Sequence, residues 1–406
     1  MLQNISPTPS RRALEFGIYR DGDNNLDAIQ EATLSQALRT SQADSRIEFT
    51  VEDTTSLHGS GLHTDDYTIA GGSIGHVARG KAREMSDEST LARFVARTLD
   101  NAEASGAKRT WLDLVDHGGG DGGGLQTGDG RCMTMPDIAQ AVADGVALHA
   151  RQHPEDAARG VDGVVANQCL MDTLGFADAL SRAGVKWLAA SPETMLAPGV
   201  PSNVAHAIAA HGNDADAMAA AIVDDVMRTK YDAGGLGRFS PAAAFDVLDL
   251  DPTKIARAEG AVEHFNDAAT AYARTAAGAR AALREDVRSV DGMARFPEAT
   301  TDMPWRADRP AIAMYDAIAS DGRLAAPLRR DAKAAGDAVR DLVLAHRESS
   351  AFAAFGGADY SDAVGPTIHA PVKRGQIDPW ASAGVSETDN AFYRGVHQDQ
   401  FAGAIA

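Results

Sequence analysis

The chain has 406 residues, of which 44% are apolar and 23% charged, an ordinary composition for a folded globular protein. A single core usually stops growing at about 250–300 residues, so we expect one main domain and an appended region. The net charge of −19, without a stripe rich in Lys or Arg, argues against nucleic acid and anionic membranes as partners. The only two cysteines, Cys132 and Cys169, exclude a disulfide framework and an all-cysteine metal site.

The N-terminal sequence, MLQNISPTPSRRALEFGIY, lacks the apolar core of a secretory signal before its first expected strand. No apolar run approaches the roughly 20 residues that span a bilayer. We therefore expect residues 1–12 to form a polar, disordered tail. We expect a monomer that acts in the cytoplasm or after export by a non-classical route.

Short strand-like apolar runs alternate with longer helical patterns over the first two thirds of the chain. This alternation predicts a mainly parallel sheet with helices on both faces. Six strands are expected, at 14–20, 46–52, 110–116, 161–167, 185–191 and 242–249. Apolar residues at spacings of three and four predict helices near 26–40, 89–105, 136–152, 172–183, 202–211 and 214–232. A short hairpin is expected within the irregular connection 53–80.

The pattern changes at Asp251, where Asp-Pro offers a helix N-cap followed by a proline in the first turn. Helical periodicity runs from there to about 287 and, after a proline-containing break at 297–310, to about 348. The last forty or so residues, rich in Gly and Pro, predict loops and weak strands. We therefore expect an α/β domain over 13–250 and a mainly helical region over 251–406.

Two side chains with catalytic potential follow successive expected strands. His117 comes just after WLDLV and precedes Gly118, and Cys169 comes just after GVVAN. Because parallel α/β sheets bind ligands at the carboxyl ends of their strands, both should face one cleft. Attack by a thiol needs a base and two donors for the oxyanion, roles that we assign to His117 and the N–H groups of Gly118 and Cys169. The helix expected after Cys169 should lower the pKa of the thiol.

Other occurrences of the same residue types lack this setting. His-Gly also occurs at 58–59 and 211–212, but neither pair follows an apolar strand. Cys132 follows a Gly-rich loop and ends no strand, so we interpret it as structural or incidental. The plain alternative for the proposed pair is a turn histidine and a small buried cysteine.

The strand-His-Gly and strand-X-Cys pattern resembles the clan of cysteine peptidases that includes caspases, legumains, gingipains and clostripain. Four segments are similar to clostripain-family segments in order and spacing: YRDGDNNLD at 19–27, DHGGG at 116–120, CLM at 169–171 and ASPETMLAPG at 190–199. The resemblance covers about residues 14–250. It implies a caspase-like three-layer sandwich and peptide-bond hydrolysis through an acyl-enzyme, with His117 as general acid/base and Cys169 as nucleophile.

One departure from the family pattern concerns specificity. Relatives that cleave after Arg or Lys typically have an acidic residue two positions before the nucleophile, where this chain has Asn167. An amide still bonds a basic side chain but loses the charge pairing. Glu193 and Asp172 are the candidates to replace that charge, so we expect cleavage after a basic residue. The alternative for Glu193 is a solvated loop carboxylate or a helix cap.

Some relatives mature by cutting themselves in the loop after the catalytic His-Gly. Arg131 is the only basic residue in the Gly-rich loop 118–131. Flexible, exposed segments of this kind are preferred sites of proteolysis. The hypothesis is therefore self-cleavage after Arg131.

The segment DGDNNLD is dense in oxygen ligands, but it fits a calcium loop poorly. An EF-hand needs Gly and Glu where this chain has Leu26 and Ala32. Turn formation and helix capping are the favoured roles of this segment. No cofactor is expected to be required, and calcium, which assists some relatives, stays as an alternative through Asp21, Asp23, Asn25 and Asp27.

Two competing functions remain open. Gly71 to Gly75 fits the G-x-S-x-G elbow of a serine hydrolase around Ser73, although the following HVARGKAREMSD lacks the apolar stripe of the helix that an elbow must open. The other competitor is a binding protein that keeps the peptidase fold without activity, because a fold alone does not establish function.

Overall fold

The structure is a computed structural model that describes residues 12–59, 61–232, 238–275, 277–293, 295, 304–349, 359–376 and 390–406. Most of its strands form one sheet in the order β13-β11-β8-β7-β6-β1-β2-β3-β4, with β5 paired to β3. Its strands are β1 Leu14–Asp21, β2 Ile47–Thr55, β3 His63–Ala70, β4 Ser73–Ile74, β5 Ala78–Lys81, β6 Thr110–Val115, β7 Gly163–Asn167, β8 Trp187–Ala190, β11 Ala244–Asp249 and β13 Val343–Glu348. Two small two-stranded sheets pair β9 (Tyr231–Asp232) with β10 (Arg238–Phe239), and β12 (Asp308–Pro310) with β14 (Thr367–His369).

The six expected strands are confirmed, and they lie next to one another at the centre of the sheet. β2, β1, β6, β7 and β8 pair in parallel, and β11 joins β8 in the antiparallel sense. Their residues are almost all buried, as expected for strands that are covered on both faces. The carboxyl ends of the five parallel strands therefore meet at one edge of the sheet.

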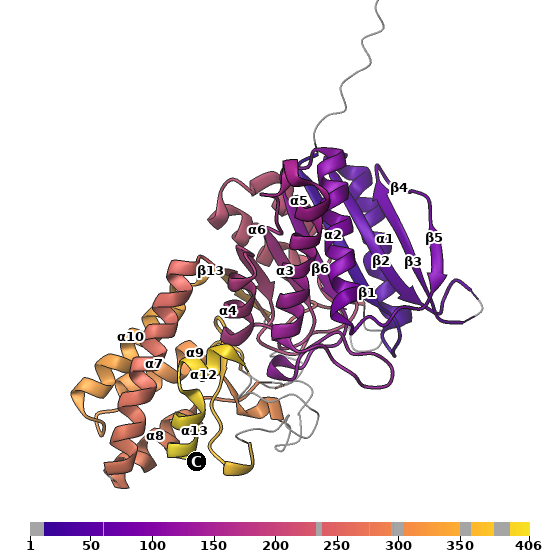
Figure 1. Ribbon diagram of the computed structural model, residues 1–406. Helices are drawn as coiled ribbons and strands as arrows, with labels where there is room; N and C mark the ends of the chain where they lie inside the picture. The colour runs from indigo at the N-terminus through magenta and orange to yellow at the C-terminus, as the bar shows by residue number, and fades with distance from the viewer. Residues whose placement is uncertain are drawn as a thin grey trace, which may run out of the picture.

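Helices cover both faces of the sheet (Figure 1). One apolar cluster joins the sheet to α1 (Asp27–Ala43), α5 (Val204–His211) and α6 (Ala215–Arg228). The other joins the opposite face to α2 (Glu88–Ser105), α3 (Met135–Gln152) and α4 (Leu174–Arg182). The predicted three-layer α/β sandwich is therefore confirmed.

The C-terminal helices gather beyond α4 and β13 (Figure 1). They are α7 Pro252–Thr275, α8 Ala277–Ser289, α9 Ala311–Ser320, α10 Ala326–Arg340, α12 Ala391–Gly395 and α13 Gln398–Ile405. The expected cap is present, because Asp251 Oδ1 accepts from the N–H of Thr253 at 2.8 Å. The core of these helices is continuous with the apolar cluster under α4.

Two expectations for this region were wrong. The segment 343–348 is strand β13, which pairs with β11 at the edge of the main sheet, where helix was expected. The last forty residues contain the short strand β14, which fits the expected weak strands, but also α12 and α13, where loops or strands were expected and where apolar residues such as Phe392 and Phe401 are buried. Tertiary packing outweighs the weak local signals in both segments. The expected boundary at residue 250 falls between β11 and α7, and β13 returns the chain to the sheet.

The hairpin expected within 53–80 is confirmed, and it removes the serine-hydrolase reading. Ala70 pairs with Ser73 across a turn in which Gly71 and Gly72 have φ of 57° and 77°. Ser73 therefore begins an exposed strand, whereas a nucleophile elbow must open a helix. The alternative of a serine hydrolase with Ser73 as nucleophile therefore lacks its required turn.

None of the described helices is both long enough and apolar enough to cross a bilayer. The expected N-terminal tail lies outside the described residues, apart from residue 12.

Candidate active site

The two predicted catalytic residues follow neighbouring parallel strands in register. Val115 of β6 pairs with Asn167 of β7, so His117 and Cys169 each lie two residues beyond a paired position. A Cβ atom on Gly118 would lie 2.4 Å from the carbonyl oxygen of Cys169 and 3.1 Å from its nitrogen. The backbone after the histidine thus rests on the backbone of the cysteine, and only glycine fits there. The structure brings His117, Gly118 and Cys169 together.

The imidazole of His117 is held by Asn25, which was considered above only as a calcium ligand. Nε2 of His117 lies 2.7 Å from Oδ1 of Asn25, in the loop after β1. When this amide oxygen accepts from Nε2–H, Nδ1 keeps its lone pair and can act as a base. Asn25 therefore fixes both the ring orientation and the tautomer of His117.

The neighbouring asparagine ties the same loop to the segment that carries the histidine. Nδ2 of Asn24 donates to Oδ1 of Asp116 at 2.6 Å and to the carbonyl oxygen of Gln126 at 2.9 Å. The N–H of Leu125 donates to the carbonyl oxygen of His117 at 3.2 Å. The DGDNNLD segment thus supports the histidine loop. It also forms the expected turns, since Asn24 Oδ1 accepts from the N–H of Leu26 at 2.9 Å.

Cys169 lies in a tight turn between β7 and α4. The N–H of Met195 donates to its Sγ at 3.2 Å, and the next residue, Leu170, has a φ of 66°. A non-glycine residue in this left-handed region is strained, and such strain gathers at functional sites. Cys169 as a whole residue is half-buried.

The expected lowering of the thiol pKa was wrong. Burial raises the pKa of Cys169, the hydrogen bond from the Met195 N–H and one from the backbone of Cys169 itself lower it, and the nearby Glu193 carboxylate raises it further, so that the net shift is upward. Helix α4 begins at Leu174, five residues after the cysteine, and its N-terminus is capped by Thr173. A helix dipole acts mainly within its first turn, so it does not reach the sulfur.

Burial also lowers the pKa of His117 below its ordinary value. The raised pKa of the thiol and the lowered pKa of the imidazole make both groups neutral near pH 7. This arrangement suits general-base catalysis, in which the imidazole takes the thiol proton as the sulfur attacks.

A cavity of about 240 Å³ opens beside the histidine. Its walls are His117, Gly118, Gly119, Gly122, Gly123, Gln126 and Cys132. Cys132, interpreted from the sequence as structural or incidental, thus borders the same cavity as His117. Burial raises the pKa of Cys132, so its thiol is also neutral.

Two of the residues expected to bind a basic substrate side chain are engaged inside the protein. The side-chain amide of Asn167 accepts from the N–H of Val200 at 2.7 Å and donates to its carbonyl oxygen at 3.2 Å. Asp172 is fully buried, and burial together with the carboxyl of Asp246 raises its pKa well above the ordinary range. Asp172 therefore faces the interior, in a position that does not suit contact with a substrate.

Glu193 is also buried, but it faces a cation. Its Oε1 lies 3.3 Å from Nε of Arg295, and its Oε2 accepts from the N–H of Arg295 at 3.1 Å and of Thr194 at 3.2 Å. Burial raises the pKa of Glu193 to about 7 although Arg295 lowers it. Glu193 is thus neither a solvated loop carboxylate nor a helix cap.

Arg131 lies on the surface of the Gly-rich loop, with 61% of its side chain exposed. Its guanidinium pairs with Asp129 at 2.8 Å and also with Glu84. The next residue is Cys132, so the Arg131–Cys132 bond adjoins the cavity at the histidine.

Three of the four residues considered for calcium, Asp21, Asn25 and Asp27, use a side-chain oxygen in a contact within the fold. Asp21 Oδ1 accepts from the N–H of Asp23 at 2.9 Å, Asp27 accepts from Thr55 at 2.8 Å, and Asn25 contacts the histidine. A buried set with donor atoms within 4.8 Å of one another consists of Asp121, Asp308 and His369. Its histidine already bonds Asp308 through Nδ1 at 2.7 Å and the carbonyl oxygen of Gln376 through Nε2 at 2.8 Å. His369 and Asp308 of this set form an ion pair within the fold.

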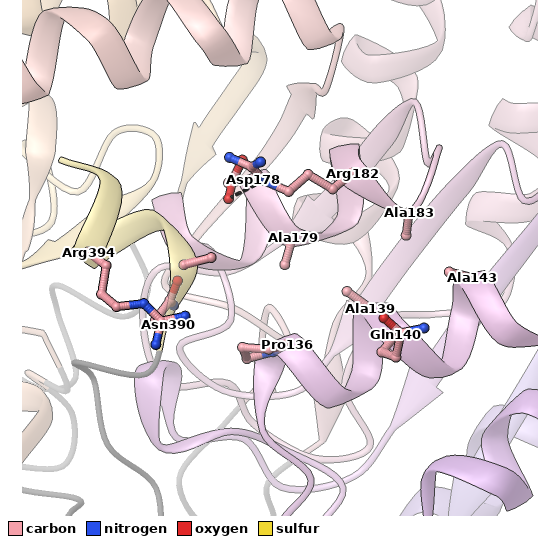
Figure 2. Close-up of a pocket in the computed structure, with 11 residues that line it drawn as sticks. Pro136, Ala139, Gln140, Ala143, Asp178, Ala179, Arg182, Ala183, Asn390 and Arg394 are labelled. Carbon is pink, nitrogen blue, oxygen red and sulfur yellow. Dashed lines mark hydrogen bonds and ion pairs between the residues drawn. The ribbon is translucent and has the colours of Figure 1, made fainter.

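A further cavity, of about 320 Å³, lies between α3, α4 and α12 (Figure 2). Figure 2 shows alanines from the two facing helices along its walls and Asn390 and Arg394 at one end. Asp178 and Arg182 are paired with each other at 2.9 Å. None of its lining residues belongs to the site at His117 and Cys169.

No family model and no curated protein matches the sequence. Solved structures do match. A secreted C11 cysteine protease from Bacteroides thetaiotaomicron, "iotapain", has a TM-score of 0.67 at 12% identity, covering 96% of this chain and 100% of that chain. An inactive zymogen C11 protease from Parabacteroides distasonis has a TM-score of 0.63 at 14% identity, covering 96% and 99%. A secreted C11 protease of B. thetaiotaomicron in complex with an irreversible peptide inhibitor gives 0.63 at 14%, covering 95% and 99%. The chain therefore has the fold of the C11, or clostripain-family, cysteine proteases.

Proposed function

We propose that the protein is a cysteine endopeptidase in which Cys169 is the nucleophile and His117 the general base. The observation that carries the proposal is the contact between the backbones of Gly118 and Cys169 at the ends of two in-register strands. This contact supports the proposal because the two backbones that meet there carry the proposed base, thiol and N–H donors. The cysteine-protease fold supports the same reaction class.

The proposed reaction follows from the protonation states. As the sulfur of Cys169 attacks the substrate carbonyl carbon, its proton passes to His117 and the carbonyl oxygen becomes an oxyanion held by the N–H groups of Gly118 and Cys169. The imidazolium then protonates the leaving amine as the C–N bond breaks. Water, deprotonated by His117, hydrolyses the resulting thioester and frees the sulfur.

The preferred substrate is a peptide with a basic residue before the scissile bond. Glu193 supports this choice, because its backbone oxygen accepts from the N–H of Leu170, next to the nucleophile, at 3.2 Å, and its carboxylate already faces a guanidinium. Asn167 is committed to Val200 and adds no charge.

Self-cleavage after Arg131 is proposed as a second step. The exposed side chain and the cavity next to Cys132 support it. Purified wild-type protein should convert into two fragments on denaturing electrophoresis, while Cys169→Ala stays whole. An intact wild-type chain under conditions where peptides are cleaved would remove this step and leave the main proposal standing.

The main proposal is tested with fluorogenic peptides that differ only in the residue before the scissile bond. The chain supplies its own control, since Cys132→Ala removes the other thiol near the histidine. Turnover should disappear in Cys169→Ala and persist in Cys132→Ala, with and without calcium. Equal turnover in wild type and Cys169→Ala would refute the proposal. A wild type that is inactive towards every peptide would favour the inactive binding protein.

A further inference from the structure

The carboxylate that we propose for substrate recognition is occupied by an arginine of the same chain. Glu193 lies in the loop after β8, whereas Arg295 lies beyond the end of α8, in the C-terminal region. Both side chains are almost completely buried, with 0% and 4% of their surfaces exposed. A buried carboxylate needs a cationic or hydrogen-bonding partner, and Arg295 supplies both through its Nε and its backbone N–H.

The same segment also covers the nucleophile. Met293, two residues before the arginine, is fully buried in an apolar cluster with Leu170, and Cys169 packs against this cluster. Met195 contacts the sulfur through its N–H, and Glu193 lies two residues before it. Met293 therefore lies against Leu170 and Arg295 against Glu193, next to the turn that presents the thiol.

The pairing at Glu193 is weaker than a fitted guanidinium–carboxylate pair. Oε1 of Glu193 and Nε of Arg295 approach to 3.3 Å, yet neither atom makes a hydrogen bond within the described residues. The Nη atoms of Arg295 bind elsewhere, at 2.6 Å from Oδ1 of Asp362 and 3.3 Å from the carbonyl oxygen of Asp291. A substrate guanidinium that met the carboxylate with two parallel bonds would pair more strongly.

We propose that Arg295 is an internal occupant of the position that receives the basic side chain of a substrate, so that the C-terminal region competes with substrate for Glu193 and covers Cys169. The inference depends on the proposed peptidase function and adds its regulation: full activity requires displacement of Met293 and Arg295. Basic substrates are the class most affected, because only they compete for the carboxylate.

The test compares Arg295→Ala with wild type on two peptides, one with Arg and one with an apolar residue before the scissile bond. Arg284→Ala is the matched control, since Arg284 donates to the carbonyl oxygens of Ile405 and Ala406, within the C-terminal helices. If Arg295 occupies the substrate position for about nine-tenths of the time, its removal in Arg295→Ala should raise kcat/KM for the Arg peptide roughly tenfold. The rise should be smaller for the apolar peptide and absent in Arg284→Ala.

A second measurement uses the segment as an added peptide. The octapeptide VDGMARFP, residues 290–297, should inhibit Arg295→Ala competitively, while the same peptide with Ala in place of Arg should not. Thermal unfolding of each variant shows whether the fold is kept. If Arg295→Ala unfolds below the assay temperature, Arg295→Lys takes its place. This variant keeps the charge but lacks the planar guanidinium group, and it should give a smaller rise in kcat/KM.

Three results would overturn the inference: an unchanged kcat/KM in a folded Arg295→Ala, an equal rise for both peptides, or loss of the fold in both Arg295 variants. The first two leave turnover sensitive to Cys169→Ala, so the peptidase proposal survives them. Absence of turnover in wild type and every variant would instead remove the proposed function together with this inference.

Discussion

The contact between Asn25 and His117 gives the sharpest test of how the site works. A single hydrogen bond of 2.7 Å joins Oδ1 of Asn25 to Nε2 of the imidazole. Such a bond between neutral groups is worth about 1 kcal/mol net, which corresponds to roughly a fivefold change in rate if it holds the productive tautomer and ring position. Asn25→Ala should therefore lower kcat about five- to tenfold and leave KM unchanged.

Asn25→Asp tests the same contact through its charge. A carboxylate in this position would favour the imidazolium by roughly 1.5–3 kcal/mol, which raises the pKa of His117 by about one to two units. The base must be neutral to accept the thiol proton, so a raised pKa means that activity is lost at a higher pH as the solution is acidified. The acid limb of kcat/KM should thus move upward by about one to two pH units.

The assay is a pH profile of kcat and kcat/KM for a fluorogenic peptide, together with thermal unfolding of each variant. Asn101→Ala is the control, because Asn101 also makes one side-chain hydrogen bond, to Thr50 at 2.7 Å, away from the site. If both Asn25 variants fold and keep the wild-type kcat and acid limb, the hydrogen bond from Asn25 does not control the imidazole of His117.

Three further predictions concern the thiol of Cys169, the close backbone contact at Gly118 and the hydrogen bond from Tyr393 to the loop that follows His117. Because burial raises the pKa of Cys169, its alkylation by iodoacetamide should reach its midpoint at a higher pH than alkylation of the same cysteine in the unfolded chain, and a lower midpoint would contradict a neutral thiol. Gly118→Ala should lower kcat/KM by roughly a hundredfold, since its Cβ would lie 2.4 Å from the Cys169 carbonyl oxygen, whereas Gly119→Ala, with its nearest neighbour at 3.8 Å, should lower it much less. Tyr393→Phe removes the donor to the buried carboxylate of Asp121 and should cost about 1–3 kcal/mol of unfolding free energy, measured by denaturant titration, and an unchanged midpoint would exclude that tie.

The sequence predicted the centre of the fold well because local pattern and tertiary position agree there. The six central strands are short apolar runs, and the helices between them keep a clear apolar face. His117 and Cys169 were found because a residue just past a parallel strand must lie at the carboxyl edge of the sheet. The sequence does not reveal that Val115 pairs with Asn167. This pairing nevertheless agrees with the positions of His117 and Cys169, each of which lies two residues after its paired strand residue.

Other parts of the site depend on the order of strands and on contacts between distant segments. Asn25 reaches His117 because β1 lies next to β6, which the order of strands along the chain does not reveal. The raised pKa of Cys169 reflects burial, and the partner of Glu193 lies 102 residues further along the chain. The strand β13 was taken for helix because the edge of the sheet that it completes is formed by β11, about a hundred residues earlier.

The proposed roles of Cys169 and His117 are tested most directly by identifying which sulfur forms a covalent bond with a substrate-like electrophile. Wild-type protein would be treated with a peptidyl chloromethyl ketone that carries arginine next to the reactive group, and the adduct would be located by mass spectrometry of the digested protein. If Cys169 is the nucleophile and His117 its base, one adduct should form, on Cys169, and it should form much more slowly in His117→Ala. An adduct on Cys132, or unchanged labelling of Cys169 without His117, would contradict these roles.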